Sequence, residues 1–249
     1  AAAGYGASGN SNSSNTAVGA SALTAVTTGG ANVAVGFSSL AANDDGGDNV
    51  AIGHKSLEAL TSSNTNVAIG DSAMRYMDNT ADGLTDCVAV GASAFAGSAT
   101  ATTIGANGTV AIGKSALAAL TVGERNLALG YQAADALTQG DDNVAIGHSA
   151  LGGATGTDGI DKNVAVGNGA MSGTNLGAAQ NVAIGYAALD DNLTSAADNN
   201  TAIGYYAGSA VTSGAENTIV GAFSADAITT GVKNTTLGAN ALSVASTAL

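Results

Sequence analysis

Residues 108–115 read GTVAIGKS, an octapeptide that satisfies the phosphate-loop pattern G-x-x-x-x-G-K-[ST]. In such a loop the middle residues turn so that successive backbone N–H groups point at the phosphates of a nucleotide. Lys114 would then contact the β- and γ-phosphates, and Ser115 would bind Mg²⁺. Taken alone, the pattern indicates nucleotide hydrolysis, provided that residues 109–112 form a loop.

An internal repeat argues against a loop at this position. Nine pentapeptides follow the pattern N-[VTL]-A-[VIL]-G and four more are variants of it, TVAIG at 109–113 among them. Their glycines recur every 17 residues in most steps and after 22 at the longest. A helical-hairpin repeat needs about 34 residues, whereas 17 residues suit one β-solenoid coil, a short β-branched strand closed by a Gly/Ser/Asn/Asp turn. We therefore expect 109–112 to be strand, Lys114 to be a variable turn residue, and the chain to have no catalytic residue and no cofactor.

Composition and charge exclude several other classes. The 249 residues include 36 Gly, no Pro and no Trp, and only 10% are charged, a composition typical of a repetitive scaffold rather than an enzyme. The net charge is −13 and the basic residues are scattered singly, which argues against nucleic acid or an anionic membrane as a partner. No apolar run approaches the length of a membrane span. The single cysteine, Cys87, allows no intrachain disulfide and leaves the compartment open.

The repeats define the domain organisation. We expect residues 1–14 to be a partial N-terminal coil or linker and residues 15–249 to be a single β-roll domain, a fragment of a longer fibre. The longest insertions, 74–86 and 96–107, should protrude from the regular body and could carry binding specificity. The predicted fold is all-β, a parallel β-roll (β-solenoid) of about 13 short coils.

Alternation along each strand predicts which side chains fill the coil. In NVAIG at 49–53 we expect Val50 and Ile52 to point inward and Asn49 and Ala51 to point outward. Further apolar columns, mostly Leu and Met, lie four and seven residues after the repeat glycine. The spacing of these two columns fits either a bent second strand or a single helical turn.

The alanine column is the predicted interface between chains. Uniform Ala would be unusual on a free solvent face, so we expect a second chain to pack against it and the stacked Asn side chains to form an amide ladder. Single coils bury few side chains, so three chains sharing these faces in a homotrimer would bury the remaining surface. The interface residues expected are Ala17, Ala34, Ala51, Ala68, Ala89, Ala111, Ala128, Ala145, Ala165, Ala183 and Ala202.

The repeats also carry a family resemblance. NVAIGHKSL, NVAIGDSAM, NVAIGHSAL and NVAIGYAAL resemble the head repeats of trimeric autotransporter adhesins of the YadA type. The longer form NTAVGASALTAVTTGGANVAVG is more similar still to repetitive bacteriophage tail-fibre proteins, and the similarity covers residues 15–242. It implies a left-handed, trimeric β-roll that serves as an adhesive head or fibre segment. The coils here are longer than typical autotransporter head repeats, so the coil geometry is not expected to transfer directly.

Candidate ligand sites are few. Acidic loops could offer oxygen ligands to Ca²⁺, although neither loop matches a known calcium motif and solvated turns are the default reading. The calcium candidates are Asp44, Asp45, Asp48, Asp158 and Asp161. The two histidines, His54 and His148, lie five coils apart and cannot share a site within one chain.

Aromatic residues gather directly after the repeat glycine in the later copies. The candidates for receptor contact are Tyr131, Tyr186, Tyr205 and Tyr206, for which capping of hydrophobic columns is the alternative role.

The function expected from these features is structural and adhesive. The chain should be part of a phage tail fibre that attaches to a host surface, in the virion or outside the cell, with itself and a surface receptor, a glycan being one candidate, as partners. The head of a bacterial trimeric autotransporter adhesin is the alternative, and a C-terminal membrane barrel in the full gene would identify it. An ice-binding solenoid is the distant alternative. It would need an outward Thr-x-Thr array, whereas the strand threonines are expected to point inward; these are Thr16, Thr201, Thr218 and Thr235.

Overall fold

The computed structural model describes residues 14–77, 84–99, 105–155, 159–175 and 177–243. Every regular element in these ranges is a three-residue β-strand, and the chain divides into two compact units, Ala1–Arg125 and Asn126–Leu249. Within the described ranges no helix has the length and apolar character needed to cross a membrane. Unit 1 holds β1 (Thr16–Val18), β2 (Val33–Val35), β3 (Val50–Ile52), β4 (Val67–Ile69), β5 (Val88–Val90) and β6 (Val110–Ile112). Unit 2 holds β7 (Leu127–Leu129), β8 (Val144–Ile146), β9 (Val164–Val166), β10 (Val182–Ile184), β11 (Thr201–Ile203), β12 (Thr218–Val220) and β13 (Thr235–Leu237).

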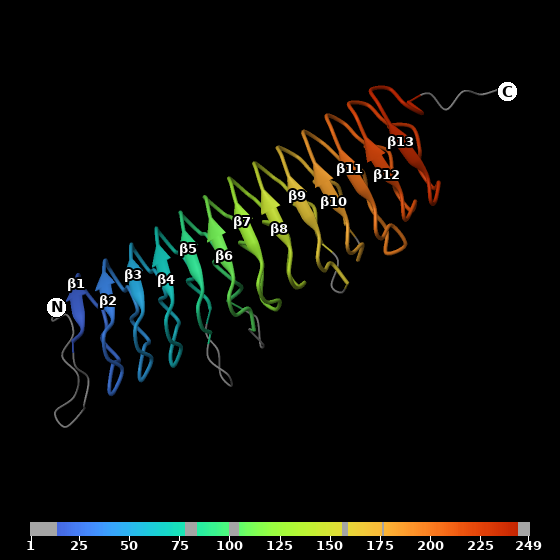
Figure 1. Ribbon diagram of the computed structural model, residues 1–249. Helices are drawn as coiled ribbons and strands as arrows, with labels where there is room; N and C mark the ends of the chain where they lie inside the picture. Colours follow the sequence, from blue (N-terminus) through green and yellow to red (C-terminus); the bar gives the residue numbers. More distant parts are fainter. Residues whose placement is uncertain (1–13, 78–83, 100–104, 156–158, 176, 244–249) are drawn as a thin grey trace. The chain divides into compact units, whose positions relative to one another are not determined.

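Within each unit every strand pairs in parallel with the strand of the next repeat (Figure 1). The register keeps equivalent residues opposite one another, so that Ala34 faces Ala51 in unit 1 and Ala145 faces Ala165 in unit 2. Hydrogen bonds between coils continue past the strands, as in Gly53 N to Val35 O at 2.8 Å. The prediction of an all-β parallel solenoid is therefore confirmed.

The segment after each strand is a pair of tight turns rather than a strand or a helical turn. In the coil of β3, Ser56 N lies 3.5 Å from Gly53 O, and Leu60 N donates to Leu57 O at 3.3 Å. Leu57 has a φ of 51°, in the left-handed region, which prevents the two turns from merging into a right-handed helix. The turn backbone also bonds to the neighbouring coil, because Leu57 N donates to Ala73 O at 3.0 Å.

The middle of the octapeptide GTVAIGKS is strand, as the repeat predicts. Val110–Ile112 form β6, and Ala111 is fully buried. Residues 110–112 therefore cannot curl around a phosphate, because their backbone is extended and paired with β5. Val110 and Ile112 occupy the same repeat positions as Val50 and Ile52, which we expected to point into the coil. That expectation is wrong, since Ile112 is exposed and Val110 only half-buried.

The interior of each coil is built from the residues predicted to face outward. Asn49 and Ala51 have no exposed surface, whereas Val50 is half-buried and Ile52 is 38% exposed. The opposite wall consists of the turn, whose Ser56 hydroxyl donates to Ala68 O of the next coil at 2.9 Å. Leucine and methionine side chains from the turn fill the coil, for example Leu57. They leave room for only a methyl group on the strand wall.

One departure from the repeat shows this size constraint directly. Where Ile219 replaces the strand alanine, Gly208 replaces the turn leucine of the preceding coil. A β-carbon on Gly208 would lie 2.9 Å from the Cδ1 atom of Ile219 and 3.1 Å from the Cδ2 atom of Leu189. The large residue on one wall is therefore accommodated by the missing side chain on the other.

Exchanging the sizes of this pair tests the packing. Gly208→Leu should destabilise the protein by about 1–3 kcal/mol through overpacking, and Ile219→Ala by about 2–5 kcal/mol through a cavity. The double variant restores the Leu/Ala combination of the other coils and should unfold within about 1 kcal/mol of the wild type. Urea unfolding followed by circular dichroism measures the coupling. Additive effects in the double variant would contradict the facing arrangement.

Candidate functional site

In each unit a column of aliphatic side chains lies on the outer face of the strands. These residues occupy the third strand position, immediately before the repeat glycine. In eight coils the exposed fraction of this side chain is 37% to 79%, and in the other five the side chain is half-buried. We call them the outer aliphatic column. Its most exposed members are Val18, Ile52, Ile69 and Ile112 in unit 1 and Leu129, Ile184, Ile203 and Leu237 in unit 2.

The alanine interface prediction is wrong. These side chains point into their own coil, where a second chain cannot reach them, because the strand wall faces the leucine-filled turn. Ala17 in the first strand is half-buried. The other ten expose at most 1% of their surface: Ala34, Ala51, Ala68, Ala89, Ala111, Ala128, Ala145, Ala165, Ala183 and Ala202.

The strand threonines also lie on the outer face and not inward. Thr16, Thr218 and Thr235 are exposed and Thr201 is half-buried. The other outward strand position in the same coils holds an aliphatic residue, such as Ile203 after Thr201. The outer face is therefore aliphatic with occasional threonine, and it lacks the Thr-x-Thr array that ice binding would need.

Three of the four candidate tyrosines come together in unit 2. The aromatic cluster consists of Tyr186, Tyr205, Tyr206 and Phe223, from the turns that follow β10, β11 and β12. Tyr186 stacks on Tyr205 with ring centroids 5.2 Å apart, and Tyr206 stacks on Phe223 at 5.8 Å. Tyr186 and Tyr205 remain nearly half exposed, so the rings cover one another only in part. The four rings occupy the first or second position after the repeat glycine. Side chains at these positions in successive coils lie in contact with one another.

The phenol of Tyr206 interacts with that of Tyr186 in the preceding coil. This interaction, together with desolvation, raises the pKa of the Tyr206 phenol. Asp190 is close enough to contribute to this shift, and burial in turn raises the pKa of its own carboxyl group. The cluster therefore has hydroxyl and carboxyl groups beside its apolar ring surface.

Tyr131 lies apart from this cluster. Its ring stacks on that of His148 at 5.4 Å with an interplanar angle of 3°. In unit 1, His54 stacks in the same way on Phe37 at 5.6 Å, and its Nδ1 atom lies 2.8 Å from the Asp71 carboxylate. Both histidines are thus turn residues with aromatic neighbours from the preceding coil.

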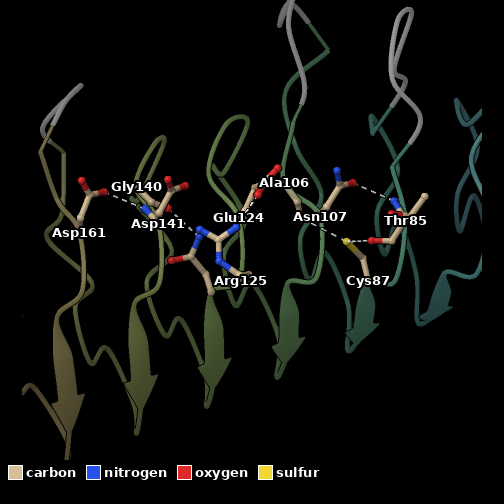
Figure 2. A network of polar contacts seen from close by, with 10 residues as sticks. Thr85, Cys87, Ala106, Asn107, Glu124, Arg125, Gly140, Asp141 and Asp161 are labelled. Carbon is tan, nitrogen blue, oxygen red and sulfur yellow. Dashed lines mark hydrogen bonds and ion pairs between the residues drawn. The ribbon is translucent and has the colours of Figure 1, made fainter.

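The calcium candidates do not converge on a site. Asp44, Asp45 and Asp48 are exposed, and the Asp44 carboxylate is hydrogen-bonded to the Thr27 hydroxyl. Asp161 accepts a hydrogen bond from the backbone N–H of Asp141 at 2.8 Å (Figure 2). Asp158 lies outside the described residues. Across the described ranges, no group of three or more His, Cys, Asp or Glu side chains could hold a metal ion.

Cys87 is an interior residue of the solenoid. It replaces asparagine in the ladder, where its thiol donates to the carbonyl oxygens of Thr85 at 3.3 Å and Ala106 at 3.2 Å (Figure 2). Burial raises the pKa of the Cys87 thiol to about 11. The thiol is therefore protonated at neutral pH, which makes it a poor nucleophile and a poor metal ligand.

Parts of three predicted features fall outside the described residues. In the N-terminal segment 1–14 only Ser14 is described. In the predicted protruding loops 74–86 and 96–107, residues 78–83 and 100–104 are not described.

Sequence reasoning overlooked the outer aliphatic column as a surface. A signal for it exists in the chain. Both departures from the repeat at Gly208 and Ile219 fall in adjacent copies, and a paired change of size indicates two positions that face each other inside a coil. The pairing indicates that the alanine column faces the turn column, and the burial of both columns in the structure assigns them to the interior.

Comparison with known proteins gives no relative from which a function could be transferred. No protein-family model, no curated protein and no solved structure matches the chain.

Proposed function

We propose that this chain is a structural and adhesive segment of a phage tail fibre, acting as a homotrimer that attaches the virion to a host surface. The observation that carries the proposal is the outer aliphatic column, which repeats coil after coil along each unit. Soluble monomers rarely expose contiguous apolar surface of this kind, and such patches mark interaction sites. The resemblance of the repeats to tail-fibre proteins supports the left-handed coil and the assembly of three chains.

A homotrimer would pair the column with itself. Three identical chains related by a threefold axis each present the same face, so one column per chain is sufficient to close the assembly. The strand threonines and valines beside the column add small β-branched side chains that pack well on a sheet face. The proposed contact between chains is therefore the outer face of the strands and not the alanine face. The proposed number of chains is still three.

The alternative is the head of a bacterial trimeric autotransporter adhesin. The same column would close that trimer, so the outer face does not distinguish the two. Both are extracellular, and in both the chain catalyses no reaction. Its net charge of −13 and scattered basic residues disfavour nucleic acid as a partner of either.

A charge placed in the column tests the trimer. Ile184→Asp should convert a three-chain particle into single chains, because a carboxylate would be buried against apolar partners. The matched control is Ser195→Asp, in an exposed turn before the next strand, which should leave the mass unchanged. Light scattering coupled to size exclusion gives the mass, and circular dichroism shows that each variant is folded. A wild-type monomer, or an Ile184→Asp variant that stays trimeric, would refute the proposed interface.

Attachment is tested separately with the same variants. Labelled wild-type protein should bind the surface of at least one strain in a panel of bacteria. The single-chain Ile184→Asp variant should bind at least about tenfold more weakly, because avidity is lost. Equal binding by both, or binding to no strain, would count against the adhesive role while leaving the trimer intact.

A further inference from the structure

The ring contacts and the charge of the aromatic cluster point to a ligand site: we infer that the cluster binds a quaternary ammonium group, that of choline, through cation–π contacts. Its four rings come from the turns that follow β10, β11 and β12 of unit 2. The ligand supplies one positive charge that is spread over methyl groups. The inference concerns a small ligand and stands independently of the proposed trimer and of attachment to a host.

The four rings form two stacked pairs whose planes are steeply inclined to each other. Tyr186 stacks on Tyr205 with ring centroids 5.2 Å apart, and Tyr206 stacks on Phe223 at 5.8 Å. The closest contact between the pairs joins Tyr205 and Tyr206, at 4.7 Å and 80°. Tyr205 also meets Phe223 at 5.2 Å and 74°. Tyr186 meets Tyr206 at 5.4 Å and 65°. Since a cation–π contact extends to about 6 Å from a ring centroid, one cation can contact several of these rings at once.

The cluster is accessible from solvent. Tyr186, Tyr205 and Phe223 are 45%, 48% and 39% exposed, and Tyr206 is half-buried. Rings that already contact one another lose little conformational freedom when a ligand is added, so most of the contact energy is available for binding. The exposed rings therefore form a preorganised surface for a small cation.

The charge of the surrounding coils favours a cation. Between Lys162 and Lys233 the chain contains five acidic residues and no basic residue. The acidic residues are Asp190, Asp191, Asp198, Glu216 and Asp226. At the end of this range, Lys233 lies 3.8 Å from the carboxylate of Glu216. The coils that carry the cluster thus repel an anionic ligand and attract a cationic one.

A quaternary ammonium group suits a surface of aromatic rings better than other cations do. A primary ammonium is strongly hydrated and has N–H donors, and a guanidinium has five donors in a fork that matches a carboxylate. Both would lose hydrogen bonds to water on contact with apolar rings. A trimethylammonium group has no N–H donor, and its methyl groups bury apolar surface against the rings. The rings and the negative charge together therefore select this group.

The two other stacked ring pairs differ from the cluster in charge. Tyr131 stacks on His148, and Phe37 stacks on His54. Each of these pairs includes an imidazole, which protonation makes positive. We therefore expect the ligand to prefer the cluster, whose four rings carry no basic group.

The test is titration of the folded chain with choline chloride at constant ionic strength. Isothermal titration gives the affinity, and saturation-transfer NMR shows whether the methyl groups of choline contact the protein. Tyr205→Ala and Tyr206→Ala each remove one ring. Both positions accept alanine in other coils, since Ala222 directly follows its repeat glycine and Ala187 is the equivalent of Tyr206, with a φ of 50°. Circular dichroism should show both variants folded, and each should weaken choline binding at least about fivefold.

Matched controls separate the ring, the hydroxyl group and the charge. Tyr205→Phe keeps the ring, and Tyr131→Ala removes a ring of the same column outside the cluster. Each should change the affinity for choline less than about twofold, because the four ring faces of the cluster remain. The neutral isostere of choline, in which carbon replaces nitrogen, should bind the wild type at least about tenfold more weakly, because it lacks the charge.

Four outcomes would overturn the inference. They are no binding of choline by the wild type, equal affinity for choline and its neutral isostere, unchanged binding in both alanine variants of the cluster, and an equal loss in Tyr131→Ala. Tighter binding of a methylguanidinium salt than of choline would also do so, since it would assign the surface to arginine side chains of a protein partner. Neither particle mass nor cell binding enters these measurements, so their failure leaves the proposed fibre function unaffected.

Discussion

Replacing Gly53 with alanine is expected to destabilise the folded protein by about 2–6 kcal/mol, through steric overlap and backbone strain acting together. A β-carbon at this position would lie 2.6 Å from the carbonyl carbon of Gly70 and closer still to its oxygen. The neighbouring coil cannot retreat, since Gly70 N is bonded to Ile52 O at 2.8 Å. Gly53 also has a φ of 137°, which side chains rarely adopt. A loss of this size is a large share of a typical domain's stability.

The control for this substitution lies in the same unit. Gly105→Ala should change stability by less than about 1 kcal/mol, because no atom lies within 4 Å of the added carbon and the φ of Gly105 is outside the positive region. Urea unfolding measures both variants, and hydrogen exchange reports whether the loss is confined to the coils that flank Gly53. Equal stability of the two variants would show that the coils are not held at the spacing described.

The second large effect is expected from the asparagine ladder. Asn163 is fully buried, and its amide nitrogen donates to Ala178 O at 3.0 Å and to the side-chain oxygen of Asn143 at 3.2 Å. Its own side-chain oxygen accepts from the backbone N–H of Asn181 at 3.0 Å. Asn163→Ala leaves the Asn181 N–H buried without this bond. It also removes one of the two bonds accepted by Asn143 Oδ1 and by Ala178 O, which keep the bonds from Asn163 N and from the Asn175 amide. We expect a loss of about 2–5 kcal/mol, of which about 1–3 kcal/mol comes from the unsatisfied N–H.

The matched control is Asn168→Ala, five residues later in the same coil. Asn168 is exposed on the turn, and its backbone oxygen, which accepts from Ala187 N at 3.0 Å, is unaffected by the substitution. Its effect should stay within about 0.5 kcal/mol, as for other surface substitutions. Thermal and urea unfolding compare the two. If Asn163→Ala were as mild as Asn168→Ala, the ladder would contribute little to holding the register.

The ladder also illustrates what a repeat makes predictable. Identical asparagines one coil apart must stack if the strands are parallel and in register, so the bond from Asn49 to Asn32, 3.1 Å between side-chain atoms, follows from the spacing alone. The expected amide ladder is present. Only its side of the strand differs from expectation, because it runs inside the coil rather than along an outer face.

The candidate site was predictable only in part. Tyrosines after the repeat glycine in successive copies must lie in one column, which brings Tyr186 close to Tyr205. Phe223 and Tyr206 are the second residues after their repeat glycines. Their place in the aromatic cluster depends on a left-handed turn backbone, with φ values of 54° and 52°. That conformation cannot be read from residue type, since bulky side chains rarely adopt it.

By itself, the sequence determined the fold class and the parallel register, and it predicted that the middle of GTVAIGKS is strand. The repeat period and the stacking of equal residues dictate all three. Only the tertiary structure decided which face of the strand is interior. Alternation separates Val50 and Ile52 from Asn49 and Ala51 but is symmetric between inside and outside. The choice depends on the space left by the leucine-filled turns, a distance across the coil that no local pattern encodes. Because that space admits only a methyl group, alanine lies inside the coil and the aliphatic column lies on the outer face.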